Sequence, residues 1–139
     1  MQDQNSGILL VEDDRVDVMT VQRALRKNRF SSPLHIARTG LEALAMLRGE
    51  GRPRIPAPSL ILLDVNLPKM SGIEFLKELR ADRDLQSSRV IVLTSSNEPQ
   101  DRDAAFQYEV DDYIVKPHSF DEFNSAIATV LSFWTAEVE

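Results

Sequence analysis

The sequence predicts an α/β protein built on a parallel β-sheet, and two patterns lead to this prediction. Short, continuously apolar runs of three or four residues recur along the chain, as in strands that are buried on both faces. The segments between them repeat apolar residues at steps of three and four, the period of an amphipathic helix. Strand and helix therefore alternate five times, which predicts a sheet with helices on both faces.

The expected strands differ in how buried they should be. The four most apolar candidates are residues 8–11, 60–63, 90–93 and 113–115, of which the last is the weakest. The candidate at residues 34–37 alternates apolar and polar residues and follows Pro33, which favours a position nearer the sheet edge. Five such units most simply form a doubly wound sheet with the flavodoxin-like strand order 2-1-3-4-5.

A capping residue precedes each expected helix. Serine, threonine and aspartate accept hydrogen bonds from the first free N–H groups of a helix, and proline suits the first turn. The expected starts are Asp14, Thr39, Ser71, Glu98–Pro99 and Ser119. Gly49 is placed to end the second helix, because glycine adopts the left-handed conformation that often follows a helix.

Length and composition limit the classes of function. The 139 residues, 42% of them hydrophobic, fit a single domain over 1–139 with its core at about 7–134 and no output domain. A net charge of −6 argues against nucleic-acid binding, and no apolar run reaches the ~20 residues of a membrane span. The chain has no cysteine, which suits a reducing compartment. A cytoplasmic location is expected.

Polar side chains follow the apolar runs, where the carboxyl ends of parallel strands form a ligand-binding edge. These residues are Glu12, Asp13, Asp64, Thr94 and Lys116. Closely packed carboxylates repel one another unless a cation intervenes, and oxygen ligands suit Mg²⁺. Lysine and threonine opposite the metal could hold the oxygens of a phosphoryl group. Asp64 could then act as the nucleophile and form an acyl phosphate.

The ordered set of motifs resembles the receiver domains of two-component response regulators, the family that includes the chemotaxis response regulator. The matching segments are LLVEDD at 9–14, LILLDVNLPKMSGIEFL at 60–76, VIVLTSS at 90–96 and YIVKP at 113–117. The resemblance implies that Asp64 is the phosphoacceptor in a Mg²⁺-dependent reaction. It also implies that Asp13 binds the metal directly, Glu12 binds it through water, and the backbone carbonyl of Asn66 supplies a further ligand.

The resemblance assigns roles to four more positions. Thr94 would hydrogen-bond the phosphoryl group and Lys116 would pair with it. Tyr113 matches the switch aromatic, which turns inward when Thr94 moves toward the phosphate. The Lys116–Pro117 bond is expected to be cis, and Gly72 would let a helix begin close to the site.

Two features favour a narrower subfamily, the stand-alone receivers that serve phytochrome-type histidine kinases. They are the Pro-rich segment at 48–58 and the segment LTSSNEPQD. A sensor histidine kinase, here a bacteriophytochrome, is the expected partner, and output would occur by protein–protein binding rather than by enzymatic turnover. The apolar stripe of the last helix spans about 160°, which favours a homodimer through the fifth strand and last helix, with Phe133 and Trp134 as candidate contacts.

Three alternatives fit the sequence less well than a receiver domain. An aspartate-nucleophile phosphatase of the haloacid dehalogenase type would place its nucleophile first and a second aspartate at position 66, which is Asn. A flavin-binding module would need a loop rich in Ser, Thr and Gly where this chain has Glu12 and Asp13. A degenerate receiver used only as a scaffold would lack part of the site. The 48–58 segment is either a solvated loop or a docking element.

Overall fold

The structure, a computed structural model, describes the backbone of residues 7–138 and the side chains of residues 7–132. Five strands and five helices alternate along this part of the chain. The strands are β1 (Ile8–Val11), β2 (Leu34–Ala37), β3 (Leu60–Leu63), β4 (Val90–Thr94) and β5 (Asp112–Val115). The helices are α1 (Arg15–Lys27), α2 (Gly40–Arg48), α3 (Gly72–Ala81), α4 (Pro99–Gln107) and α5 (Phe120–Val138).

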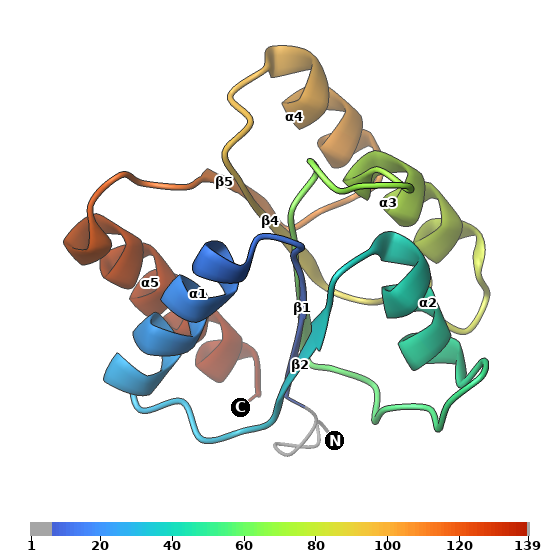
Figure 1. Cartoon of the computed structure of the whole chain (residues 1–139), viewed down its shortest axis with the longest axis horizontal. Coiled ribbons are helices and arrows are strands. Elements are labelled where there is room, and N and C mark those ends of the chain that lie inside the picture. The colour runs from blue at the N-terminus through green and yellow to red at the C-terminus, as the bar shows by residue number, and fades with distance from the viewer. Residues whose placement is uncertain (1–6, 139) are drawn as a thin grey trace.

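The strands form one parallel sheet in the order β2-β1-β3-β4-β5, which confirms the predicted topology. Helices α1 and α5 pack against each other on one face, and α2, α3 and α4 cover the other (Figure 1). Because all strands run the same way, one edge of the sheet collects their carboxyl ends and the opposite edge their amino ends. We call these the carboxyl edge and the amino edge.

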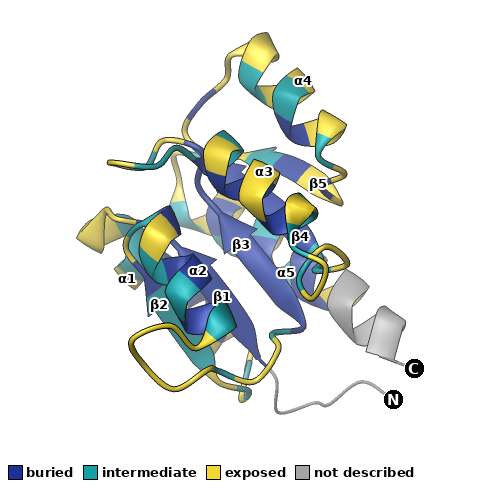
Figure 2. Cartoon of the chain, turned by 90° about the vertical axis from the view of Figure 1, so that its right-hand side faces the viewer, coloured by how far each residue is buried: buried dark blue, intermediate teal, exposed yellow. Residues whose placement is uncertain are grey.

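Each face of the sheet has its own hydrophobic core. The first core includes Leu9, Ile61, Phe75 and Leu79, and lies under α2, α3 and α4. The second includes residues of β1, β3 and β4 facing α1 and α5. Strands β1, β3 and β4 are buried along their whole length, whereas β2 and β5 are partly exposed (Figure 2). This agrees with the continuously apolar runs and with the predicted edge position of residues 34–37.

Capping hydrogen bonds confirm four of the five predicted helix starts. The remaining helix, α4, starts at Pro99 as predicted, but the Glu98 side chain forms no capping hydrogen bond. The Asp14 carboxylate accepts from the N–H groups of Val16 and Asp17, and Ser71 and Glu74 form a reciprocal capping box. The remaining caps are the Thr39 hydroxyl, which accepts from Glu42 N–H, and the Ser119 hydroxyl, which accepts from Glu122 N–H. Gly49 follows α2 in the left-handed conformation at φ 75°. These short-range bonds explain why local sequence located the helices well.

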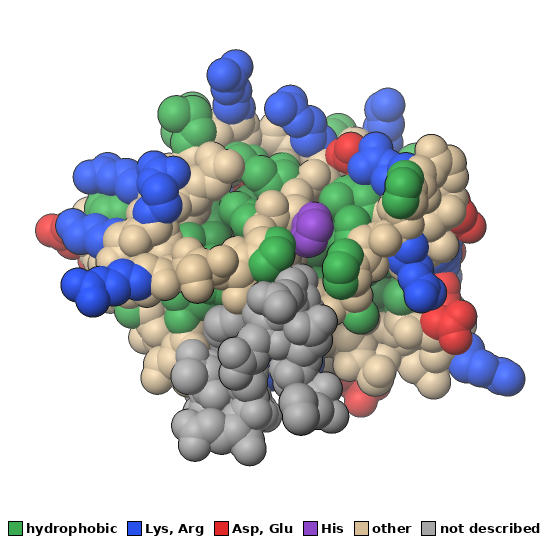
Figure 3. Space-filling model, turned by 90° about the horizontal axis from the view of Figure 1, so that it is seen from below, with side chains coloured by type: hydrophobic (Ala, Val, Ile, Leu, Met, Phe, Trp, Pro, Cys, Tyr) green, Lys and Arg blue, Asp and Glu red, His purple; other side chains and the backbone are tan. Residues whose placement is uncertain are grey.

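Charge is distributed unevenly between the two edges of the sheet. The first turn of every helix carries an acidic residue, and the last turns of α1, α2 and α3 carry basic ones. This arrangement complements the helix dipoles. Figure 3 looks onto the amino edge, where Lys and Arg side chains project around the rim and hydrophobic side chains lie between them. The amino edge is therefore the more basic end of an acidic protein.

Two expectations for the last third of the chain have different outcomes. The predicted cis bond between Lys116 and Pro117 is wrong, because the described residues contain no cis peptide bond. An X–Pro bond favours trans by roughly 0.5–1 kcal/mol, and the trans chain still carries Lys116 to the carboxyl edge. The side chains of Phe133 and Trp134, the candidate dimer contacts, lie outside the described residues. No helix in the described range is long and apolar enough to cross a membrane.

An ion pair joins the ends of α2 and α3. Arg48 Nε donates to Asp82 Oδ2 at 2.9 Å, and Arg48 Nη2 lies 3.7 Å from Glu78 Oε1. The hydrogen bond from Arg48 is the main reason that the pKa of Asp82 lies below its ordinary 3.8, and the Asp84 N–H adds to the effect. A carboxyl whose pKa is lowered by folding contributes stability above its unfolded pKa and loses it as the pH falls through its folded pKa.

We therefore expect Asp82→Asn to lower the melting temperature at neutral pH, with the difference shrinking toward zero near about pH 2. Thermal unfolding followed by circular dichroism at the two pH values measures this. Asp103→Asn, on the exposed face of α4, is the matched control and should change neither value. An equal loss at both pH values for Asp82→Asn would show that the charge of Asp82 does not contribute.

Candidate functional site

Four strand ends bring polar side chains together at the carboxyl edge. Glu12 follows β1, Asp64 follows β3, Thr94 ends β4 and Lys116 follows β5. Glu12, Asp64 and Thr94 are buried although they are polar, at 3%, 5% and 0% exposure. Buried polar groups require partners, so their side chains must satisfy one another or a bound ion.

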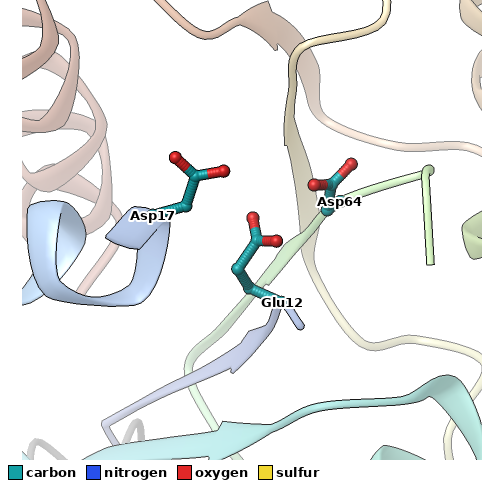
Figure 4. Close-up of side chains that lie close together, drawn as sticks. All are labelled: Glu12, Asp17 and Asp64. Atoms are coloured by element: carbon teal, nitrogen blue, oxygen red, sulfur yellow. The ribbon is translucent and has the colours of Figure 1, made fainter. Parts of the chain in front are cut away.

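Three carboxylates form the centre of this site. One oxygen from each of Glu12, Asp17 and Asp64 lies within 4.8 Å of the others. Figure 4 shows the three side chains, which come from the end of β1, the first turn of α1 and the end of β3, pointing toward one another. Such a set of hard oxygen donors is chemically suited to Mg²⁺ or a similar divalent cation.

Lys116 contacts all three carboxylates. Its ammonium Nζ lies 2.6 Å from Glu12 Oε1, 2.7 Å from Asp17 Oδ2 and 3.1 Å from Asp64 Oδ2. Only 9% of the Lys116 side chain is exposed, so these interactions are poorly screened by solvent. One ammonium offsets one of the three negative charges, and the remainder favours a second cation at the site.

The pKa values of the cluster reflect this balance. Burial raises the pKa of Glu12 to about 7, and the negative charge of Asp64 adds to the increase, whereas the hydrogen bond from Lys116 opposes it. Burial alone would lower the pKa of Lys116, but its hydrogen bonds to Asp17 and Glu12 outweigh burial and raise the pKa above its ordinary value. Lys116 therefore stays protonated at neutral pH. Glu12, whose pKa is raised, would be stabilised in its charged form by a further cation.

Hydrogen bonds fix the orientation of the Asp64 carboxylate. Thr94 Oγ1 donates to Asp64 Oδ1 at 2.6 Å, and the Asn66 N–H donates to the same oxygen at 2.9 Å. The other oxygen, Oδ2, faces Lys116. Both oxygens of the predicted phosphoacceptor are thus held in place by residues from three different segments. The structure leaves the expected role of the Asn66 carbonyl as a metal ligand untested.

A hydrogen-bonded path connects Thr94 to α4 and to Tyr113. Ser96 N–H donates to Thr94 Oγ1 at 3.3 Å, and Ser96 Oγ donates to Asp101 Oδ2 at 2.5 Å. The Tyr113 hydroxyl donates to the Ser96 carbonyl at 3.1 Å. Tyr113 is 5% exposed and faces inward, and its burial raises its pKa. The Thr94 hydroxyl thus contacts Asp64 while the Tyr113 side chain is buried; the switch expected for these two residues stays a prediction.

The sequence analysis missed two residues of this arrangement. Asp17 lies in the carboxylate cluster, whereas Asp13, the predicted direct ligand, is exposed and outside the cluster. Asp17 is the third residue after the Asp14 cap, a spacing that places it in the first helical turn facing the edge, and this signal was available. Ser96 is buried and Ser95 exposed, but nothing in the local sequence distinguishes these neighbouring serines.

Gly72 allows α3 to begin against the segment that carries Asp64. A Cβ added at Gly72 would lie 2.5 Å from Val65 Cα and 2.6 Å from the Asp64 carbonyl oxygen. These contacts are with backbone atoms, which cannot move aside as a flexible side chain could. The Gly72 N–H also donates to the Val65 carbonyl at 3.0 Å. The expected close approach is confirmed, and it holds the backbone next to Asp64.

Comparison with known proteins adds a family match. Residues 8–128 match the family model of the response regulator receiver domain. The response regulator Rcp1 of Synechocystis sp. is 38% identical over 132 residues, covering 94% of this chain and 90% of Rcp1. This relative and the matched family residues cover most of the chain, including all five strands.

Solved structures of similar proteins agree in fold. The Mn²⁺-bound form of Rcp1 aligns with a TM-score of 0.81 at 38% identity, covering 91% of this chain and 92% of Rcp1. The phosphorylated cyanobacterial phytochrome response regulator RcpA aligns with a TM-score of 0.83 at 34% identity, covering 94% of each chain. The bacteriophytochrome response regulator RtBRR aligns at 0.74 with 40% identity, covering 88% of this chain and 75% of RtBRR.

Replacing Gly72 tests whether the close approach of α3 to the backbone of Asp64 and Val65 requires a glycine. Gly72→Ala should lower the free energy of unfolding by about 2 kcal/mol, because the new methyl group meets backbone on two sides. Urea unfolding measures the loss. Gly51→Ala is the control, since Gly51 has a φ of +74° but nothing within 4 Å of the added Cβ, so it should lose only about 1 kcal/mol of backbone strain. A Gly72→Ala protein as stable as the original chain would contradict this packing argument.

Proposed function

The chain belongs to the response regulator receiver domain family of two-component systems, and from this premise we propose that Asp64 accepts a phosphoryl group from a sensor histidine kinase in a Mg²⁺-dependent reaction. The observation that carries the proposal is the environment of the Asp64 carboxylate. It is buried at the carboxyl edge, with Thr94 at 2.6 Å from one oxygen and Lys116 at 3.1 Å from the other. These are the groups that would receive the oxygens of a transferred phosphoryl group.

In the proposed transfer, an Asp64 oxygen attacks the phosphorus of a phosphohistidine. The new O–P bond forms as the N–P bond breaks, and the imidazole nitrogen leaves with the electron pair. Thr94 would donate to one phosphoryl oxygen and Lys116 would pair with another. A divalent cation held by the carboxylates would neutralise part of the negative charge that is spread over the phosphoryl oxygens. Later attack by water on phosphorus would restore the Asp64 carboxylate and release inorganic phosphate.

The metal ligands we propose are Glu12 through water, and Asp13, Asp64 and the Asn66 carbonyl directly. Asp13 directly follows Glu12 at the carboxyl edge, and its exposed carboxylate has no partner among the described residues. Rotation about χ1 of an exposed side chain is fast and nearly free, so Asp13 can turn toward the cluster. Asp17 is already paired with Lys116 at 2.7 Å, and we assign it to orienting that ammonium.

The switch we propose is the path from Thr94 through Ser96 to Tyr113. A phosphoryl group adds about −1.5 to −2 charges at Asp64 and would compete for the Thr94 hydroxyl. Because Ser96 also bonds Asp101 in α4, displacement of Thr94 changes the support of that helix. Helix α4 buries only Ala105 among its own residues, so its attachment is weak enough to respond. Output would occur by protein binding at this surface.

The proposed kinase is of the phytochrome type. Two of the similar solved structures are phytochrome response regulators by name, and the Rcp1 structure contains Mn²⁺. These descriptions concern those proteins, and they support the partner and the divalent metal for this chain. We place the reaction in the cytoplasm, where a sensor kinase obtains its phosphate from ATP.

Intact mass spectrometry after treatment with a small phosphodonor and Mg²⁺ tests phosphoryl transfer. We expect one phosphoryl group per chain, and none without the metal or in Asp64→Asn. The exposed Asp103→Asn variant is the matched control and should accept the group normally. Phosphorylation of Asp64→Asn to the normal extent would contradict the proposal.

Metal titration by calorimetry separates Asp13 from Asp17. Asp13→Asn should weaken Mg²⁺ binding more than Asp17→Asn does, because Asp13 would be a direct ligand, whereas Asp17 would act on the site through Lys116. We expect a loss of roughly tenfold for Asp17→Asn, the lower end of the range for groups that orient a metal site. The reverse order of the two effects would place the metal on the Glu12, Asp17 and Asp64 oxygens instead.

We also propose a homodimer through β5 and α5. Val115 on β5 is 38% exposed and Phe106 on the adjacent α4 is 41% exposed, so apolar surface is accessible next to the open edge of the sheet. Sedimentation at tens of micromolar, with and without phosphodonor, should give a dimer, and Val115→Asp should shift it toward monomer. A monomer under both conditions would eliminate this assembly.

A further inference from the structure

A groove of about 660 Å³ opens at the amino edge of the sheet. One wall is formed by residues 54–58 at the end of the Pro-rich segment together with Ser59, and the other by the loop between α3 and β4, residues 82–89. Ser59 directly precedes β3 and Arg89 directly precedes β4, whereas Asp64 follows β3. The five residues from Ser59 to Asp64 span about 16 Å in a strand, so the groove and the phosphoacceptor site lie at opposite ends of the sheet.

Both walls are held in place by hydrogen bonds. In the first wall, the Ile55 N–H donates to the Met46 carbonyl at 3.0 Å and the Ser59 N–H donates to the Gly7 carbonyl at 2.8 Å. The opposite loop is fixed by Arg80, whose Nη1 donates to the carbonyls of Gln86 at 2.9 Å and Ser88 at 2.7 Å. A groove with fixed walls needs little ordering when a ligand binds, which favours affinity.

The groove combines an apolar floor with an available cation. Leu47 is buried, and Ile55 and Leu85 pack against the first core from the two walls. Asp82 is neutralised by Arg48 at 2.9 Å. Arg54 is exposed and has no hydrogen bond or ion pair with any other residue in the described part of the chain. Its guanidinium can therefore form a bidentate pair with a carboxylate from outside.

We propose that this groove docks an acidic peptide segment of a partner protein. A Glu or Asp side chain of the segment pairs with Arg54, and a neighbouring apolar side chain packs between Ile55 and Leu85. The basic rim of the amino edge (Figure 3) complements such a segment. Because the groove lies away from Asp64, a bound segment leaves the phosphoacceptor accessible to a kinase.

Other polyanions fit the groove less well. A phosphodiester backbone carries a charge at every nucleotide and no apolar side chain that could pack between Ile55 and Leu85, so it would use the cation of the groove and leave the apolar floor uncovered. Proteins that lie on a membrane insert protruding apolar side chains into the lipid interface. The apolar residues here line a groove and do not protrude, which argues against membrane binding at this site. A peptide in which acidic and apolar residues alternate can pair with Arg54 and also pack an apolar side chain between Ile55 and Leu85.

The test uses the full chain and a short labelled peptide in which Glu and Leu alternate. Fluorescence anisotropy measures its binding, and NMR amide shifts locate it. We expect shift changes confined to residues 47–48, 54–59 and 82–89. Replacement of Glu by Gln or of Leu by Ser in the peptide should each weaken binding.

Variants of the groove separate charge from shape. Arg54→Glu should weaken binding at least tenfold, because it places like charges opposite each other. Ser87→Trp, at an exposed position of the second wall, should weaken it by filling the groove. Arg26→Glu makes the same charge change at an exposed position on α1 outside the groove and should leave binding within about twofold. Both groove variants alter exposed loop residues, and circular dichroism verifies their folding.

Three results would overturn the proposal. Shift changes that map to another surface would place the peptide elsewhere. Equal weakening by Arg54→Glu and Arg26→Glu would show that the peptide binds by general charge attraction and not at the groove. Tighter binding of a DNA oligonucleotide or an anionic lipid vesicle to the same residues would replace the peptide with that class of ligand. Phosphorylation of Asp64 is measured separately, so failure here leaves the proposed function unaffected.

Discussion

The buried ammonium of Lys116 is the interaction on which the carboxyl edge depends. Three carboxylates lie close enough to share a single ion, and each is in contact with this one cation. Removal of one partner from a buried ion pair commonly destabilises a protein by about 3–5 kcal/mol. The cluster retains excess negative charge with Lys116 in place, and this excess favours a divalent cation. In the proposed function, that cation would then offset the negative charge of a phosphoryl group.

The fold brings these charges together by simple means. Parallel strands place their carboxyl ends at one edge, and the N-terminus of a helix follows each strand, so the Asp64 carboxylate is held by groups from several segments. Thr94 is bonded both to Asp64 and, through Ser96, to the segment before α4. In the proposed switch, a change of charge at Asp64 would reach the weakly packed helix α4 through these few hydrogen bonds. The amino edge lies at the opposite end of the strands from Asp64, which is why the partner proposed there would leave this site accessible.

Much of this could be predicted from sequence because its causes are local. Apolar runs and capping side chains fix the strands and helix starts, and strand ends locate Glu12, Asp64 and Lys116. Residues whose roles depend on partners far away in the sequence were harder to predict. The role of Asp17 depends on its contact with Lys116, which is 99 residues away in the sequence. The Lys116–Pro117 bond, expected to be cis, is trans. The haloacid dehalogenase and flavin alternatives end with the family match.

The most direct test of the central claim is to identify the phosphorylated atom. Borohydride reduces an aspartyl phosphate to homoserine, so reduction of the phosphorylated chain followed by peptide mapping reveals which carboxylate carried the group. Homoserine at position 64, and at no other position, is the predicted result. Homoserine at position 13 or 17, 5-hydroxynorvaline at position 12, or a phosphoryl group on a histidine would contradict the account, because the carboxylate held by Thr94 and Lys116 would then not be the acceptor.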